Sequence, residues 1–183
     1  MLSRLCQIAL AVFLVQAFLG TGLAQTQPPA PPQAPTPQVR CGPDHVILYK
    51  RAVSLLDNAE KKLTARYTAE AKSQAKEAKS LFAILQRECG QEQKERLLTP
   101  KEGQQEAINQ KLSADEQAQA ERLMKSAEEK EKKSAQLEAK QPELSVKYQR
   151  EAKDEYEQAQ KRSIKAMIYS LRTQQMLFQF LAK

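Results

Sequence analysis

Proline and glycine are unevenly distributed along this chain, and their distribution limits what it can fold into. The segments between them are long, because these two residues are the strongest interrupters of regular structure. Ala, Glu, Lys, Gln and Leu dominate those segments, and runs of β-branched residues are nearly absent. This composition favours helices over sheets, so the chain is predicted to be all-α. Beyond residue 40, proline and glycine occur only at Gly42, Pro43, Gly90, Pro100, Gly103 and Pro142.

Residues 1–24 have the features of an export signal. Arg4 supplies a positive start, residues 5–19 are apolar apart from two glutamines, and Gly22 and Ala24 are the small residues that a signal peptidase recognises. We expect cleavage after Ala24 and a bacterial protein exported to the periplasm or secreted. The alternative is an uncleaved membrane anchor, although the stretch falls short of the roughly 20 apolar residues of a membrane span.

Residues 25–40 form a segment rich in proline. The sequence QTQPPAPPQAPTPQVR contains six prolines, which cannot propagate a helix and favour an extended polyproline conformation. We interpret the segment as a disordered linker between the export signal and the folded part. A ligand for a proline-binding groove is the alternative interpretation.

Residues 41–90 are predicted to form a short helical hairpin. Pro43 suits the first turn of a helix, a break is expected at residues 64–67, and Gly90 is predicted to cap the second helix. Two antiparallel helices bring Cys41 and Cys89 together at the open end. An even pair of cysteines in an exported chain indicates a disulfide, which would contribute up to about 4 kcal/mol in the chain-entropy model.

A metal site is the competing interpretation of these cysteines. Two cysteines 48 positions apart and the single His45 lack the four closely spaced ligands of a structural zinc site, so no metal is expected. His45 is predicted to be an exposed residue in the first turn of its helix. No catalytic residues and no cofactor are predicted, because the sequence offers neither a nucleophile–base arrangement nor a phosphate-binding loop.

Residues 91–183 are predicted to form a longer hairpin whose turn lies at Gln141-Pro142. Helices are expected to start at Pro100 and Pro142, with a second start near Ser113, which has a capping-box spacing to Glu116. Large apolar residues gather at the open ends of both hairpins, and the tip of the longer one is charged. We therefore expect the ends to join in a four-helix bundle or coiled-coil-like domain. The long hairpin is predicted to supply Leu97, Leu98, Ile108 and Leu112 to face the apolar residues between Ile164 and Leu181.

The C-terminal 23 residues combine positive charge with apolar residues. The whole chain has a formal net charge of +7, and this segment contains no acidic residue. Such a helix binds an anionic membrane surface or a protein partner, and the same pattern suits a helix whose apolar face lies in the core. Nucleic acid is excluded as a partner, because the chain is exported and lacks basic residues interleaved with aromatic ones. The candidate contact residues are Lys161, Arg162, Lys165, Arg172 and Lys183.

Two short motifs resemble those of a known family. Residues 98–102 (LTPKE) and 112–116 (LSADE) are similar to the LTxxQ motif of the Spy/CpxP group of periplasmic helical-hairpin proteins, with Glu in place of the final Gln in both. The resemblance covers about 20 residues. It implies an exported, basic, all-helical protein that acts as a stress-linked chaperone or sensor and cradles unfolded clients.

Three functional hypotheses follow from the sequence. The first is a non-enzymatic structural or interaction protein of the bacterial cell envelope with a protein partner there. The second is a periplasmic chaperone or stress sensor that binds unfolded clients. The third is a peripheral binder of anionic membranes that acts through residues 161–183. The partner and the oligomeric state are left open by the sequence.

Overall fold

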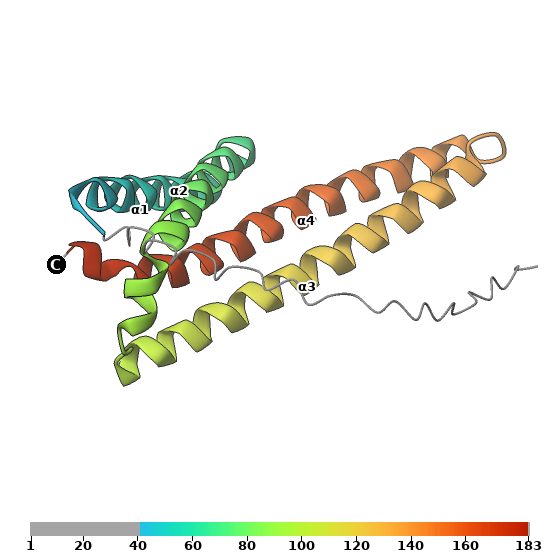
Figure 1. The fold of residues 1–183 in the computed structure, drawn as a ribbon. Helices are drawn as coiled ribbons and strands as arrows, with labels where there is room; N and C mark the ends of the chain where they lie inside the picture. Colours follow the sequence, from blue (N-terminus) through green and yellow to red (C-terminus); the bar gives the residue numbers. More distant parts are fainter. Residues whose placement is uncertain (1–40, 183) are drawn as a thin grey trace, which may run out of the picture. The chain divides into compact units, whose positions relative to one another are not determined.

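The computed structural model describes residues 41–182 and is helical over most of that range (Figure 1). No strand occurs in these residues, which confirms the all-α prediction for the described part of the chain. The expected signal peptide at residues 1–24 and the Pro-rich linker at residues 25–40 lie outside it. The elements are α1 (Pro43–Thr64), α2 (Thr68–Glu95), α3 (Pro100–Leu137), α4 (Pro142–Leu177) and a short 3-10 helix, η1 (Gln179–Ala182).

Three of the four α-helices begin at a proline. Pro43, Pro100 and Pro142 each occupy the first turn of a helix, where the N–H that proline lacks would have no partner within the helix. The predicted starts of α3 and α4 and the predicted break at residues 64–67 are therefore confirmed.

Two predicted boundaries are wrong. Gly90 does not cap α2, which continues to Glu95, because the residues after Gly90 are Gln, Glu and Lys, which favour the helix. Ser113 does not start a new helix, since α3 runs through it without interruption. Its hydroxyl instead donates a hydrogen bond to the carbonyl of Ala166 in α4, at 2.9 Å.

The link between α2 and α3 is fastened to the end of α4. Thr99 and Glu102 form a capping box, in which the Glu102 N–H donates to the Thr99 hydroxyl at 3.3 Å and the Thr99 N–H donates to the Glu102 carboxylate at 2.8 Å. Arg96 pairs with Glu102 and donates to the carbonyls of Met176 and Leu177 at 3.3 and 3.4 Å. A cation at the carboxyl end of a helix is favourable, because the helix dipole is negative there.

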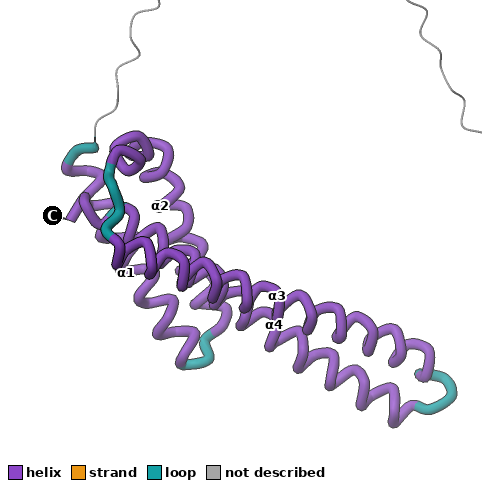
Figure 2. Tube along the Cα trace, turned by 90° about the horizontal axis from the view of Figure 1, so that it is seen from below, coloured by secondary structure: helices purple, strands orange, loops and turns teal. Residues whose placement is uncertain are grey.

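The helices pair as two antiparallel hairpins, α1 with α2 and α3 with α4 (Figures 1 and 2). The C-terminal half of α4 also packs against α1 and α2. Among the described α-helices, α3 packs along α4 alone, and its first turn is also bonded to Arg96 at the end of α2 and to Gln179 of η1. The rest of the α3–α4 hairpin projects past α1 and α2 in both views.

The hydrophobic core lies where α1, α2, α4 and η1 meet. The expectation that the long hairpin contributes both of its helices is wrong, because α3 supplies no residue to this core. Leu97 is 91% exposed, and Ile108 and Leu112 are exposed as well. The physical reason is that α3 packs on the side of α4 that faces away from α1 and α2. The core residues include Leu56, Phe82, Leu85, Ile164, Ile168, Leu171, Phe178 and Leu181.

This core makes a prediction about two leucines. Leu85 is fully buried and Leu97 is 91% exposed. Leu85→Ala is expected to lower the free energy of unfolding by about 2–5 kcal/mol, because it removes buried methyl groups and leaves a cavity. Leu97→Ala makes the same chemical change at the surface and is expected to change it by about 0.5 kcal/mol or less. Urea unfolding followed by circular dichroism measures both, and equal losses would contradict the assigned core.

Candidate functional site

The two cysteines lie at the open end of the α1–α2 hairpin. Their sulfur atoms are at bonding distance, 2.01 Å, and their Cα atoms are 5.5 Å apart. Cys41 precedes α1, whereas Cys89 lies within α2 and is buried. The predicted proximity of these residues is therefore confirmed, and the bond ties the start of α1 to the last turns of α2.

His45 lies beside these cysteines and is buried. It is 9% exposed, so the prediction of an exposed residue is wrong. Its Nδ1 accepts a hydrogen bond from the Gly42 N–H at 3.0 Å, and its Nε2 lies 3.1 Å from the Glu88 carboxylate. The ring is enclosed because α2 packs over the first turn of α1. Hydrogen bonds from Arg87 and then from His45 lower the pKa of Glu88, which keeps the carboxylate ionised near neutral pH.

Cys41, His45 and Cys89 together form a cluster of metal-ligating groups. One ligand atom from each residue lies within 4.8 Å of the other two. Sequence spacing alone concealed this cluster, because Cys89 is far from the other two along the chain. A signal was present nevertheless: the hairpin that joins Cys41 to Cys89 also places the residue one helical turn after Cys41 next to α2.

The positive residues of the C-terminal segment are mostly engaged within the protein. Arg162 and Lys165 both contact the buried Glu116 of α3, each at 2.8 Å. Arg172 pairs with Asp57, at 2.8 Å, and with Glu60, both in α1. No ion pair involves Lys161 within residues 41–182, and Lys183 lies outside the described residues. These ion pairs connect α4 to α3 on one side and to α1 on the other.

The apolar face of the same segment lies in the core. Ile164, Ile168 and Leu171 are each 3% exposed or less. The segment therefore has its apolar residues against α1 and α2, which is one of the two roles that its sequence suits. Over the described residues, no helix combines the length and apolar character needed to cross a membrane.

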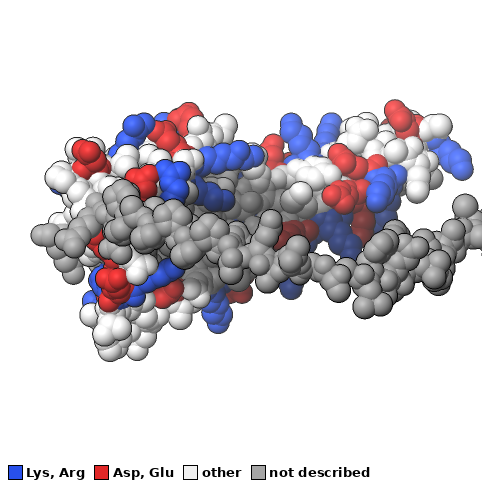
Figure 3. Space-filling model, in the orientation of Figure 1, with Lys and Arg blue, Asp and Glu red and all other residues white. Residues whose placement is uncertain are grey.

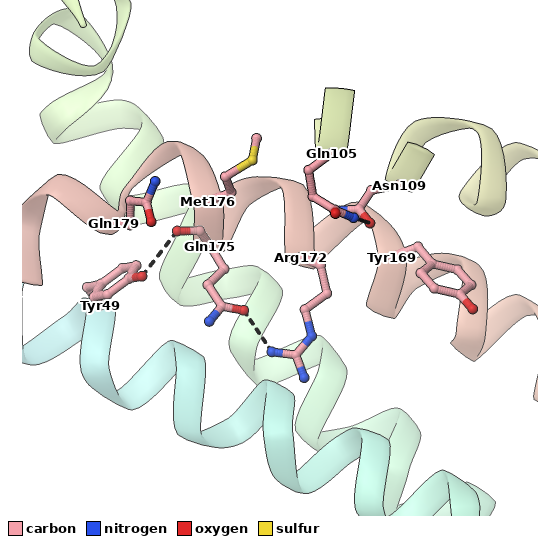
Figure 4. Close-up of a pocket in the computed structure, with 8 residues that line it drawn as sticks. All are labelled: Tyr49, Gln105, Asn109, Tyr169, Arg172, Gln175, Met176 and Gln179. Carbon is pink, nitrogen blue, oxygen red and sulfur yellow. Dashed lines mark hydrogen bonds between the residues drawn. The ribbon is translucent and has the colours of Figure 1, made fainter. Parts of the chain in front are cut away.

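A polar hollow of about 400 Å³ lies beside α4, between α1 and the first turns of α3 (Figure 4). The Tyr49 hydroxyl donates to the carbonyl of Gln175 at 3.1 Å, and Arg172 donates to the side-chain oxygen of Gln175 at 2.7 Å. Gln105 donates to Asn109 at 3.0 Å. Among these bonds, the one from Tyr49 to Gln175 joins α1 to α4, whereas the others lie within α3 or within α4.

The seam between α3 and α4 is made of small residues at seven-residue intervals. Two hydrogen-bonded contacts define the antiparallel register: Ser113 with Ala166, and Ser134 with Ser145, whose hydroxyls are 2.9 Å apart. This register places Ala127 opposite Ala152 and Ala120 opposite Ala159, all of them buried. We call residues 120–137 and 142–159 the outer arm. Figure 3 shows acidic and basic side chains interspersed along the visible face of this hairpin.

Comparisons with family models, with curated proteins and with solved structures found no match to this chain.

Glu116 provides a test of the ion pairs that hold α3 to α4. Burial raises the pKa of this carboxyl, but hydrogen bonds from Lys165 and Arg162 outweigh burial and hold the pKa below its usual value. A depressed folded-state pKa stabilises the fold above the ordinary Glu pKa of about 4.3, and this stabilisation is lost as the pH falls through the folded-state pKa. Glu116→Gln is expected to lower the free energy of unfolding by about 1–3 kcal/mol at neutral pH.

The difference in free energy of unfolding between the wild type and Glu116→Gln is expected to shrink as the pH falls below about 4. The wild-type carboxyl is then protonated and, like the Gln side chain, carries no charge. Urea unfolding at several pH values measures this. Glu129→Gln, at an exposed position on the same helix, is the matched control. A difference that stayed constant with pH would show that the ion pairs are not its cause.

Proposed function

We propose that this chain is a non-enzymatic helical interaction protein of the bacterial cell envelope, and that its outer arm binds a protein partner. One observation carries the proposal: the outer arm projects beyond the three-helix core while contributing nothing to it. At 1.5 Å per residue, the part of α3 that belongs to the outer arm is about 25 Å long.

The seam of the outer arm supports this assignment. Its buried positions are occupied by Ala and Ser, so the two helices gain little hydrophobic stabilisation from one another. Specific polar contacts hold them instead. Lys130 pairs with Glu151 at 3.1 Å and with Glu155 at 2.8 Å, and the Tyr156 hydroxyl donates to Glu131 at 2.9 Å. The seven-residue repeat of small buried residues favours a coiled-coil-like pairing.

Small seam residues leave most of the long side chains of the outer arm on its surface. Most positions on either side of the turn at residues 138–141 are exposed and charged or polar. None of these side chains belongs to the hydrophobic core, and the exposed ones are accessible to a partner. Charged residues of both signs favour a protein partner over an anionic membrane surface, which attracts basic residues.

Export is part of the proposal and rests on the sequence of residues 1–24. A disulfide between Cys41 and Cys89 suits an oxidising compartment such as the periplasm. A chaperone or stress sensor, as the Spy/CpxP resemblance implies, would also be exported and helical. A chaperone of this kind binds many unfolded clients, whereas we propose one defined partner. Photo-crosslinking separates the two.

Photo-crosslinking from the outer arm tests the proposal. A benzoylphenylalanine at Val146, which is 45% exposed near the tip, is expected to give one or a few discrete adducts in cells of the source bacterium. The same probe at Ile47, which is 65% exposed on α1, is the matched control and is expected to give none of them. A broad ladder of adducts would indicate a client-binding chaperone instead. No adduct from Val146 would contradict the proposal.

A register-preserving deletion tests the same arm without a probe. Removing residues 121–127 together with 152–158 takes one seven-residue repeat from each helix and keeps Ser134 opposite Ser145. The tip then moves inward by about 10 Å. The free energy of unfolding is expected to change by about 1 kcal/mol or less, since the core is untouched, while the Val146 adducts are lost. Retained adducts in the shortened protein would show that the length of the arm does not matter.

A further inference from the structure

We infer that Cys41, His45 and Cys89 bind Zn²⁺ when the disulfide is not formed. In this site two thiolates and one imidazole nitrogen hold the ion, and a carboxylate or a water molecule completes its coordination. The inference concerns the open end of the α1–α2 hairpin and is independent of the partner proposed for the outer arm.

The positions of the three residues suit a tetrahedral ion. Zn–S bonds of about 2.3 Å and Zn–N bonds of about 2.0–2.1 Å place the ligand atoms of a tetrahedral site roughly 3.4–3.8 Å apart. The present ligand atoms all lie within 4.8 Å of one another, so they are already gathered at this scale. The two sulfur atoms must separate, and the imidazole must give up its hydrogen bond from Gly42. Cys41 lies outside α1, in non-helical chain, and can move without breaking either helix.

The surroundings of His45 match those of a metal-ligating histidine. Such a histidine usually donates its second ring N–H to a carboxylate, which fixes the tautomer and the ring orientation. Glu88 occupies that position, 3.1 Å from Nε2. The lone pair of Nδ1 then points toward the start of α1, where it now accepts the Gly42 N–H at 3.0 Å. Zn²⁺ would bind this lone pair in place of the Gly42 N–H.

A fourth ligand is available at the same place. The Glu92 carboxylate accepts a hydrogen bond from the Cys41 N–H at 3.0 Å, one helical turn beyond Glu88. Carboxylate oxygens bind Zn²⁺ in mixed sites with cysteine and histidine. The cluster of ligand atoms within 4.8 Å of one another does not include Glu92, so its carboxylate would have to move toward the ion, and water is the other occupant of the fourth position.

The disulfide-bonded state and the zinc-bound state interconvert through the free thiols. The newly made chain carries both cysteines as thiols, and a dithiol reductant regenerates them from the disulfide. In that exchange the dithiol is oxidised to its own disulfide, and two electrons and two protons pass to the cysteine sulfur atoms. Zn²⁺ then binds the two thiolates, and the two thiol protons pass to solvent. The disulfide and the metal therefore exclude each other, and either one ties the start of α1 to α2.

Cobalt provides the direct test, because Co²⁺ takes tetrahedral sites of this kind and reports its ligands by absorption. The full chain with Cys6→Ser, in which Cys41 and Cys89 are the remaining cysteines, is reduced with a phosphine, freed of reductant without oxygen and titrated with Co²⁺. We expect thiolate-to-cobalt charge-transfer bands and the visible bands of tetrahedral Co²⁺ at one ion per chain, which Zn²⁺ abolishes. The oxidised protein is expected to show neither. Absence of these bands in the reduced protein would overturn the inference.

Variants identify the ligands. His45→Asn and Glu88→Gln are each expected to weaken Zn²⁺ binding about tenfold or more, measured by competition with a chromophoric chelator. Glu77→Gln, at an exposed position of α2 that pairs with Arg51, is the matched control and is expected to bind as the wild type does. If His45→Asn bound Zn²⁺ as tightly as the wild type, His45 would not be a ligand and the inferred ligand set would be wrong.

A second measurement covers the case in which the reduced chain loses structure. Far-ultraviolet circular dichroism follows helix content and melting temperature of the reduced protein with and without Zn²⁺. An ion that binds the folded state alone raises the melting temperature. We expect that rise in the wild type and its absence in Cys41→Ser. A rise of equal size in Cys41→Ser would show that Zn²⁺ acts elsewhere.

Discussion

The C-terminal half of α4 carries the packing on which the rest of the fold depends. One face of this segment places Ile164, Ile168 and Leu171 against α1 and α2, and these side chains are almost fully buried. Its other side presents Arg162 and Lys165 to Glu116 of α3. Among the α-helices of residues 41–182, α4 is therefore the one that packs against both helices of the other hairpin, and η1 after it also packs on α1. Hydrophobic burial stabilises one junction, while buried charge and hydrogen bonding hold the other.

This division explains why the two hairpins differ in character. The α1–α2 hairpin contains large apolar side chains such as Leu56 and Phe82, because it shares them with α4. The outer arm lies beyond the reach of that core and has only its own seam. Alanine and serine at every seventh position allow the two backbones to approach closely, but each buries little apolar area. The register must then come from polar contacts, such as the one between Ser134 and Ser145.

Much of this architecture could be predicted from the sequence, and the misses have physical causes. The proline positions predicted where three helices begin, because proline suits a first turn whatever surrounds it. The prediction that α2 ends at Gly90 was wrong, because a helix can continue through a glycine when the residues after it favour helix. The apolar positions of α3 misled as well, because hydrophobicity indicates that a residue can be buried but does not identify its neighbour. Ile108 and Leu112 lie on a helix that packs along α4 and not against α1 or α2.

His45 shows most clearly what a linear pattern omits. Its spacing from Cys89 along the chain argued against a shared site, yet the hairpin that was inferred to bring the cysteines together also brings this ring beside them. A buried imidazole requires hydrogen-bonding partners on both of its nitrogens. Here Gly42 and Glu88 provide those partners. The contact with Glu88 would also orient the ring as a metal ligand when the disulfide is absent, whereas the Gly42 contact would give way to the ion.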